Sequence, residues 1–215
     1  MEGGKTVKIG IIGTGNIGSG LAQVLGRTKH GVVVADTQGG AEAAEKLRAA
    51  GVNVRAADVK TAVAQADVAI LAIPYGAVAS VAEVADFSGR IVIDLTNPVT
   101  DDFSGLRLGF ETSAAEEIAK RLSGAKVVKA FNTIFAEIYA KGPNFGSTQA
   151  QTFVASDDAE AKATVITIAK DAGFDPQDAG GLKNARYLEP LGYMNIQFGY
   201  MLGRGTQIAP VWLAR

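Results

Sequence analysis

A glycine-rich segment directly after the first apolar run constrains this chain more than any other feature. Val7–Ile12 is apolar apart from one lysine and leads into Gly13-Thr14-Gly15-Asn16-Ile17-Gly18, with a helical stretch expected at residues 17–25. In this spacing the first glycine permits a tight turn, the second lets a pyrophosphate approach the backbone, and the third lets the helix lie close to the strand. The segment predicts a dinucleotide site, with an ordinary glycine turn as the alternative.

An acidic residue follows at the end of the second apolar run, Val32–Ala35. Asp36 is placed to accept hydrogen bonds from the adenosine ribose hydroxyls. It would repel a ribose phosphate by about 4 kcal/mol at a separation of ~4 Å and an effective dielectric constant of ~20. Thr37 and the next three residues supply no lysine or arginine. We therefore expect Asp36 and Thr37 to bind the cofactor and NAD to be preferred over NADP; the alternative for Asp36 is a helix cap or turn residue.

The remaining pattern alternates short β-branched runs with alanine-rich helical stretches. The expected strands are Asp67–Ile73, Arg90–Asp94, Lys126–Ala130, Gln151–Ala155 and, more weakly, Val52–Arg55; the expected helices are Ala41–Ala50, Gly76–Asp86 and Thr112–Leu122. Capping-box spacing at Ser113 with Glu116, and at Asp157 with Glu160, predicts two helix starts. This alternation predicts an α/β fold with a doubly wound (Rossmann-type), mostly parallel sheet over residues 6–180.

The last part of the chain has a different pattern. Leu182–Leu202 is one long stretch with apolar residues near helical spacing. We expect residues 181–215 to form a small C-terminal helical portion that packs across the strand ends or against a partner subunit.

Composition excludes several classes of function. The 215 residues contain 21 lysines and arginines against 22 acidic residues, which argues against binding nucleic acid or an anionic membrane through bulk charge. There is no cysteine and one histidine, so thiolate chemistry, Cys-ligated metals and a His-rich metal site are excluded. No signal peptide or bilayer-spanning run is visible, and we expect a cytoplasmic protein without a membrane or nucleic-acid partner.

Five segments, in order and spacing, resemble the deazaflavin (coenzyme F-420)-dependent NADP oxidoreductases and the cytosolic reductase domain of the six-transmembrane metalloreductases. These are residues 11–22 around the glycine loop, Ile73-Pro74-Tyr75, Asp94-Leu95-Thr96-Asn97-Pro98, residues 127–134 and residues 178–186. The resemblance implies a compact dinucleotide fold, usually a homodimer. It also implies that hydride passes directly between a nicotinamide at the strand ends and a flat acceptor such as coenzyme F-420 or FMN.

This chain departs from that family at two places. NADP-binding members carry a small polar residue followed by Arg-Arg where Asp36-Thr37-Gln38 stands, and archaeal members carry a histidine in place of Asn132.

Residues at the predicted strand ends complete the candidate site. For the cofactor we expect Ile73, Pro74, Tyr75, Asn97, Ala130 and Asn132 in addition to the glycine loop, and for the acceptor Asn132, Thr133, Ile134 and Met201. The two asparagines are candidate donors to a carboxamide or ring carbonyl, with turn or cap positions as the alternative. No metal ligand and no catalytic side chain is predicted.

Direct hydride transfer needs two rings held face to face and no proton donor on the protein. The single histidine, His30, precedes the second strand at the end of the sheet away from the cofactor, so we expect it to be structural or exposed to solvent. Two other functions stay open: a dehydrogenase of a small carbonyl or imine substrate, and a non-catalytic NAD(H)-binding redox sensor.

Overall fold

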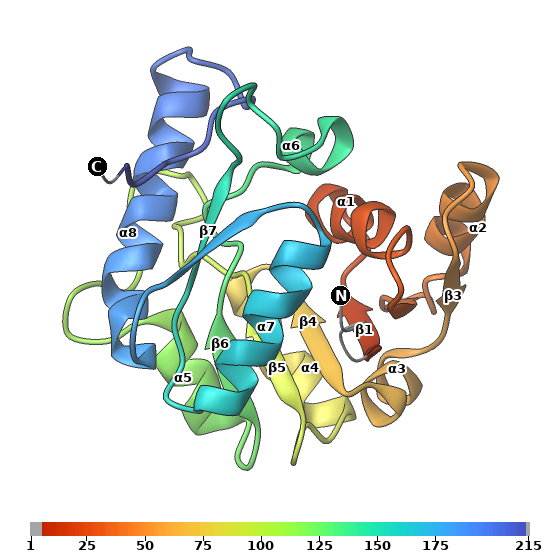
Figure 1. Cartoon of the computed structure of the whole chain (residues 1–215). Coiled ribbons are helices and arrows are strands. Elements are labelled where there is room, and N and C mark those ends of the chain that lie inside the picture. The colour runs from red at the N-terminus through yellow and green to blue at the C-terminus, as the bar shows by residue number, and fades with distance from the viewer. Residues whose placement is uncertain (1–5, 214–215) are drawn as a thin grey trace.

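The computed structural model describes residues 6–213 and places a six-stranded parallel sheet at their centre (Figure 1). The strands are β1 (Lys8–Ile12), β2 (Gly31–Ala35), β3 (Val54–Ala56), β4 (Val68–Leu71), β5 (Ile91–Asp94) and β6 (Lys126–Lys129). Their order across the sheet is β3-β2-β1-β4-β5-β6, which is the doubly wound order of a Rossmann-type fold. The predicted fold class is confirmed, and the order reverses between β1 and β4, where such sheets bind ligands.

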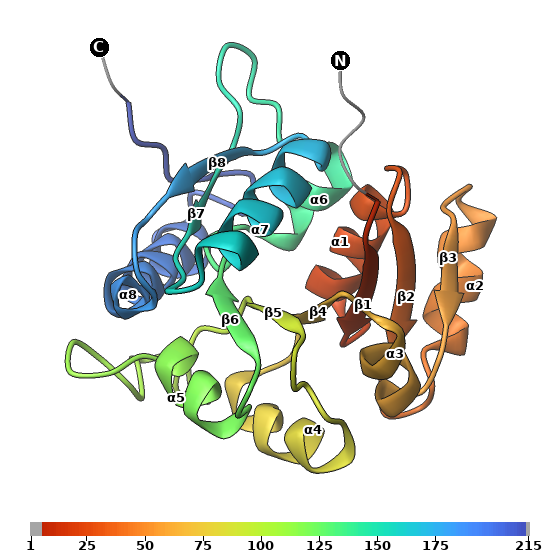
Figure 2. The same cartoon turned by 60° about the horizontal axis from the view of Figure 1, so that its bottom comes forward.

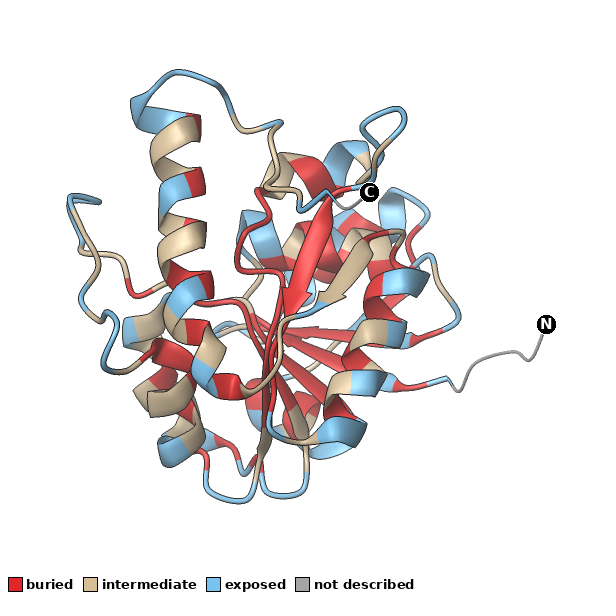
Figure 3. Ribbon diagram, turned by 60° about the vertical axis from the view of Figure 1, so that its left-hand side comes forward, coloured by how far each residue is buried: buried red, intermediate tan, exposed pale blue. Residues whose placement is uncertain are grey.

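Helices cover both faces of this sheet (Figure 2). One layer contains α1 (Asn16–Leu25), α2 (Ala41–Ala49), α6 (Ala136–Lys141) and α7 (Ala159–Asp171), and the other contains α3 (Val59–Gln65), α4 (Val78–Val84) and α5 (Ala114–Arg121). Successive strand residues alternate between the two cores, because side chains in a strand point to opposite faces. Ile9 and Ile11 belong to the first core and Ile12 to the second, so the strands are buried on both faces (Figure 3).

A second, two-stranded sheet lies beside the first. β7 (Gln151–Val154) pairs in parallel with β8 (Asp175–Asp178), and α7 connects them. β7 was expected among the parallel strands, but it meets the main sheet through an antiparallel bridge between Lys129 and Ala155, with N···O distances of 2.9 and 3.0 Å. The sequence pattern does not predict β8, because its four residues Asp-Pro-Gln-Asp have no apolar face.

Helix caps follow the predicted chemistry with one error. Ser113 caps α5 as expected, since its hydroxyl oxygen accepts from the Glu116 N–H at 3.2 Å. At α7 the predicted cap Asp157 is wrong by one residue: Asp158 is the cap, and its carboxylate accepts from the Ala161 N–H at 2.8 Å. Asp157 instead accepts from the Leu182 N–H at 2.9 Å, so it joins the α7 start to the C-terminal helix.

The predicted C-terminal helical stretch is present over residues 182–201, and residues 202–213 form no helix. It starts with a 3₁₀ turn (Leu182–Asn184), continues as α8 (Ala185–Ile196) and ends with a π-helical turn (Gln197–Met201). The inner face of α8 lies against the carboxyl ends of the strands, where Asn132 donates to the Leu188 carbonyl at 2.8 Å. Residues 214 and 215 of the predicted extension lie outside the described part. Among residues 6–213, no helix has the length and apolar character needed to cross a membrane.

His30 holds the start of β2 against α7. It is buried, its Nδ1 accepts from the Val7 N–H at 3.4 Å, and its Nε2 lies 3.0 Å from the Asp171 carboxylate. Burial lowers the pKa of His30 below its ordinary 6.5, although Asp171 opposes this shift. The histidine therefore has the structural role expected of it.

This environment predicts that acid weakens the fold through His30. Because the pKa is lower in the folded chain than in the unfolded chain, the unfolded state binds more protons near pH 6, and stability falls as the pH falls through 6.5. We expect urea midpoints measured between about pH 7.5 and 5.5 to decrease in the wild type and to change less in His30→Gln. A variant with an equally steep decrease would contradict this assignment.

Candidate functional site

The glycine loop has the geometry that the sequence predicts. Gly13 has a φ of 104°, and a Cβ there would lie 2.3 Å from the Ala72 carbonyl oxygen, so only glycine fits this turn. A Cβ on Gly18 would lie 1.9 Å from the Gly13 carbonyl oxygen. The glycine at this position therefore lets α1 lie close to the loop. Gly15 is different, because a Cβ there would meet no atom within 4 Å. Packing within the chain does not require a glycine at position 15, but close approach of a ligand would.

The helix start behind this loop is suited to an anion. Gly15 is the N-cap of α1, no side chain caps it, and the first turn has no acidic residue. Ser19 does not cap the helix, because its hydroxyl donates to the Thr14 carbonyl at 2.8 Å. Uncapped N–H groups and the helix dipole together place about half a positive charge at this point. The α1 start thus has the chemistry that suits the diphosphate of a dinucleotide.

Asp36 lies at the end of β2 and is held by the loop that follows it. Its Oδ1 accepts from the backbone N–H groups of Gln38 and Gly40, both at 2.8 Å, and its Oδ2 accepts from the Thr14 hydroxyl. The Thr14 hydrogen bond and these backbone donors hold the pKa of Asp36 below its ordinary value. The carboxylate is therefore charged at neutral pH, and it orders the turn as well as linking it to the glycine loop.

A cavity of about 700 Å³ opens beside the loop at the carboxyl ends of the strands. It brings together many of the predicted site residues: Gly15, Asn16, Ile17, Ile73, Pro74, Tyr75, Asn97, Asn132, Thr133 and Ile134. The others lie outside its lining. Gly13, Thr14, Gly18, Asp36 and Thr37 belong to the two loops behind it, Ala130 is buried under it, and Met201 is 57% exposed. The structure thus joins the glycine loop to the ends of β4, β5 and β6 and leaves Met201 out.

The two asparagines bind each other and the C-terminal helix. Asn132 donates through Nδ2 to the Asn97 side-chain oxygen at 3.0 Å and to the Leu188 carbonyl at 2.8 Å, and Asn97 donates to the Asn132 carbonyl at 2.8 Å. The amide of Asn132 therefore has no free N–H for a ligand, and its side-chain oxygen can act as an acceptor. This differs from the expected donor role, and it results from α8, which the strand pattern does not place.

α8 is able to approach the asparagines because residue 192 is a glycine. A Cβ on Gly192 would lie 2.7 Å from the Asn97 side-chain oxygen and 2.9 Å from Asn132 Nδ2. One helical turn further, Asn195 donates to the Thr133 carbonyl at 3.0 Å. The inner face of α8 is thus fitted to the polar strand ends.

Two buried hydroxyl groups belong to the residues that line the cavity. Within residues 6–213, the Oγ1 atoms of Thr96 and Thr133 have no hydrogen-bond partner, and both residues lie in the wall. A buried polar group without a partner costs about 1–3 kcal/mol. A ligand with polar edges would reduce that cost at this wall, whereas a purely apolar ligand would not.

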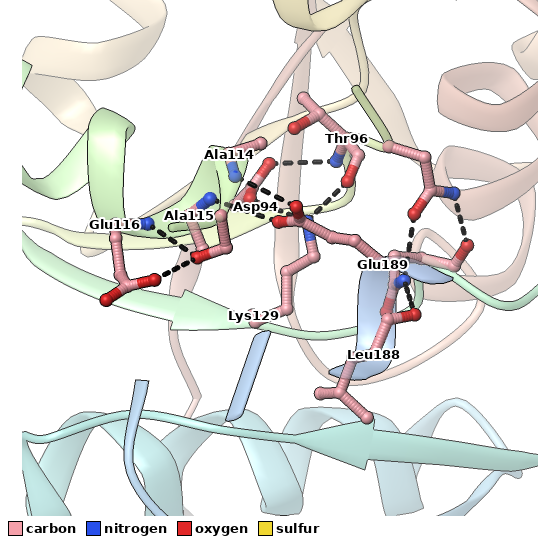
Figure 4. A network of polar contacts seen from close by, with 11 residues as sticks. Asp94, Thr96, Ala114, Ala115, Glu116, Lys129, Leu188 and Glu189 are labelled. Carbon is pink, nitrogen blue, oxygen red and sulfur yellow. Dashed lines mark hydrogen bonds and ion pairs between the residues drawn. The ribbon is translucent and has the colours of Figure 1, made fainter. Parts of the chain in front are cut away.

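Behind the wall lies a buried ion cluster that the sequence analysis did not identify (Figure 4). Lys129 Nζ is 2.8 Å from the Asp94 carboxylate and 2.9 Å from the Glu189 carboxylate, and all three side chains are almost completely buried. Lys129 also donates to the Thr96 carbonyl, and Asp94 accepts from the Thr96 N–H at 2.8 Å. The cluster therefore fixes the backbone of Thr96 from both sides.

Glu189 connects this cluster to α5. Its two carboxylate oxygens accept from the Ala114 and Ala115 N–H groups at 2.9 and 3.1 Å, at the start of that helix (Figure 4). Burial raises the pKa of Glu189, and Lys129 opposes this shift. Burial would lower the pKa of Lys129, but Asp94 and Glu189 outweigh it and keep the pKa above its ordinary value.

A sequence signal for half of this cluster exists. Lys129 stands within a buried apolar run, and Asp94 ends the preceding strand, so adjacent parallel strands carry opposite charges at the same end. Nothing in the periodicity indicates that Glu189 would turn inward, because that depends on how α8 lies on the sheet.

Comparison with known proteins points to one family. Residues 8–98 match the sequence profile of a family described as NADP oxidoreductase, coenzyme F420-dependent. The chain is 33% identical over 188 residues to metalloreductase STEAP3 from Rattus norvegicus, a match covering 86% of this chain and 36% of the rat protein. It is 32% identical over 104 residues to human metalloreductase STEAP2, covering 48% of this chain and 19% of that protein. The chain thus spans about a third or less of the length of these relatives.

Solved structures give whole-chain similarity. A hypothetical protein from Sinorhizobium meliloti is 32% identical with a TM-score of 0.73, covering 83% of this chain and 86% of that one. A proposed F420-dependent NADP-reductase from Arthrobacter sp. FB24 is 27% identical with a TM-score of 0.80, covering 95% and 100%. An imine reductase from Pseudomonas sp. has a TM-score of 0.66 at 19% identity, covering 92% and 64%, and shows the fold alone.

Two glycine variants separate folding from dinucleotide binding. Gly15→Ala adds a methyl group to open space, so we expect a stability loss under about 1 kcal/mol but at least tenfold weaker NADH binding by calorimetry. Gly18→Ala drives a methyl group into the Gly13 carbonyl, so we expect it to lose about 1–3 kcal/mol of stability. Unchanged NADH affinity in a folded Gly15→Ala variant would contradict the site.

Variants of the ion cluster should differ in a defined order. Lys129→Met leaves two buried carboxylates without their cation and should cost about 3–5 kcal/mol in guanidinium unfolding. Glu189→Gln should cost less, because the pair between Asp94 and Lys129 persists. Equal or reversed costs would mean that the cluster is not organised around Lys129.

Proposed function

This chain belongs to the coenzyme F420-dependent NADP oxidoreductase family, and from that premise we propose that it passes hydride directly between a nicotinamide dinucleotide and a flat deazaflavin- or flavin-type acceptor. The observation that carries the proposal is the shared cavity. One cavity is lined both by the start of the α1 anion site and by the ends of three strands. A dinucleotide bound at the loop would therefore present its nicotinamide to the same space that an acceptor ring enters.

The protein's part in this reaction is to bind, orient and exclude water. Gly15 and the α1 N–H groups would hold the diphosphate, and Asp36 with Thr37 would hold the adenosine ribose. Pro74 and the Asn132 side-chain oxygen would orient the nicotinamide, whose bound dihydropyridine form supplies the hydride. Within the described chain, Asp101 and Arg107 are the charged residues of the cavity lining. The other lining residues are uncharged, which fits ring-to-ring transfer, since that step needs no proton donor from the protein.

The acceptor is tested by turnover. We expect the protein to oxidise NADH with a deazaflavin or FMN under anaerobic conditions, followed as loss of NADH absorbance. Ferric chelates belong in the same assay, because curated relatives are metalloreductases. Turnover with simple ketones or imines instead would favour the dehydrogenase alternative. Tight NADH binding without turnover of any acceptor would favour the redox sensor.

Asp36 supports NAD as the preferred cofactor. Its carboxylate is charged and fixed in place, and Thr37 and Gln38 offer no positive charge to a ribose phosphate. We expect Asp36→Ser combined with Thr37→Arg to shift the ratio of kcat/KM toward NADPH by tenfold or more, equivalent to ~1.4 kcal/mol. A wild-type protein that already prefers NADPH would contradict this proposal while leaving the hydride-transfer function intact.

We also propose a homodimer formed through the outer face of α8. Tyr187, Met194 and Met201 are large exposed side chains at helical spacing along this face and the turn after it, while the inner face is occupied by the strand ends. A second copy would bury these groups. Sedimentation of the wild type and of Met194→Glu tests this proposal. We expect a dimeric wild type and a monomeric variant, and a monomeric wild type would contradict the proposal.

A further inference from the structure

A hairpin loop, residues 98–107, forms the part of the cavity wall that lies beside α8 and away from α1 (Figures 1 and 2). The loop is closed by an antiparallel bridge between Val99 and Leu106 and by a hydrogen bond of 2.6 Å from the Arg107 N–H to the Pro98 carbonyl. Tyr193 of α8 donates to the Phe103 carbonyl at 3.0 Å and so ties the loop tip to the helix. The loop is therefore a built part of the site.

This loop carries the positive charge of the cavity. In the part of the chain that the structure describes, Arg107 is the basic residue of the lining, and Asp101 is the acidic one. The other lining residues are neutral. The proposed diphosphate site at the α1 start belongs to a different element, so the diphosphate has its own donors and does not depend on Arg107.

The guanidinium of Arg107 is oriented and still has donors to offer. Its Nε donates to the Val99 carbonyl at 3.3 Å, and its Nη2 donates to Asp101. An arginine has five N–H groups in a fork that matches a carboxylate or phosphate. Asp101 is 96% exposed and Arg107 is 47% exposed, and such surface pairs contribute at most about 1 kcal/mol. A ligand anion can therefore replace Asp101 at little cost.

Aromatic side chains line the same cavity as Arg107 and the strand ends. Tyr75, Phe103, Phe135 and Tyr200 line it, and the rings of Phe135 and Tyr200 meet edge to face with centroids 5.6 Å apart. Flat rings pack well against such walls.

We infer that the acceptor of this site is an anion: its ring lies among these aromatic side chains and its phosphate or carboxylate group binds Arg107. The inference rests on the proposed hydride transfer and adds the charge class of the acceptor to it. Arg107 would be a specificity-determining residue that acts on acceptor binding and leaves the transfer step unchanged.

Matched acceptors with and without a phosphate test this inference. FMN is compared with riboflavin, and 5-deazariboflavin 5′-phosphate with 5-deazariboflavin, each with NADH under anaerobic conditions. We expect KM to be about tenfold lower for the phosphorylated member, with similar kcat. In Arg107→Met this preference should disappear, because KM rises for the phosphorylated acceptor alone. Arg107→Lys should retain part of it, since a lysine keeps the charge without the fork.

Lys170→Met is the control for loss of one positive charge, because Lys170 is an exposed residue of the last turn of α7 outside the cavity lining. It should keep the full preference. A wild type that does not discriminate within either pair, or an Arg107→Met variant that weakens both members equally, would overturn the inference and leave hydride transfer standing. Failure to oxidise NADH with all four acceptors would instead contradict the proposed function itself, and the inference with it.

Discussion

The buried ion cluster at Lys129 is the interaction on which the rest of the site depends. Three elements distant in sequence supply charges to one point: Asp94 from β5, Lys129 from β6 and Glu189 from α8. A buried charge is tolerated only when it is paired, so each element fixes the position of the others. Because Lys129 and Asp94 also hold the backbone of Thr96, the cluster shapes the cavity wall without entering the cavity. The ion cluster is thus a buried polar support behind the part of the cavity wall that contains Thr96.

The charged groups and dipoles at the site lie on different elements. The α1 start presents uncapped backbone N–H groups, Asp36 lies at the end of β2, where we propose that the ribose binds, and Arg107 stands on the loop beside α8. Between them the lining consists of aromatic, apolar, amide and hydroxyl groups. In the proposed reaction, fixed dipoles around a largely uncharged wall would favour transfer between two bound rings. In the proposed hydride transfer, geometry rather than acid–base chemistry would be the protein's main contribution.

Much of this arrangement could be predicted from the sequence because local rules decide it. The turn at Gly13 needs a positive φ, the strands are continuous apolar runs, and Ser113 caps its helix through one short contact. The predictions that were wrong or missing concern features that depend on contacts with other segments. The strand β8 forms from Asp-Pro-Gln-Asp because β7 offers it hydrogen bonds, and Asp158 takes the cap position that the spacing assigned to Asp157.

The sequence by itself determined the doubly wound sheet, the glycine loop and the acidic residue after the second strand, because each is indicated by a local pattern: alternating apolar and helical runs, a glycine spacing, and the residue that ends a run. The tertiary structure alone decided what the strand ends present to a ligand. Docking of α8, made possible by Gly192, leads one N–H group of the Asn132 amide to donate to the Leu188 carbonyl and turns Glu189 toward Lys129. Those contacts join residues more than fifty positions apart, and no periodicity within either segment encodes them.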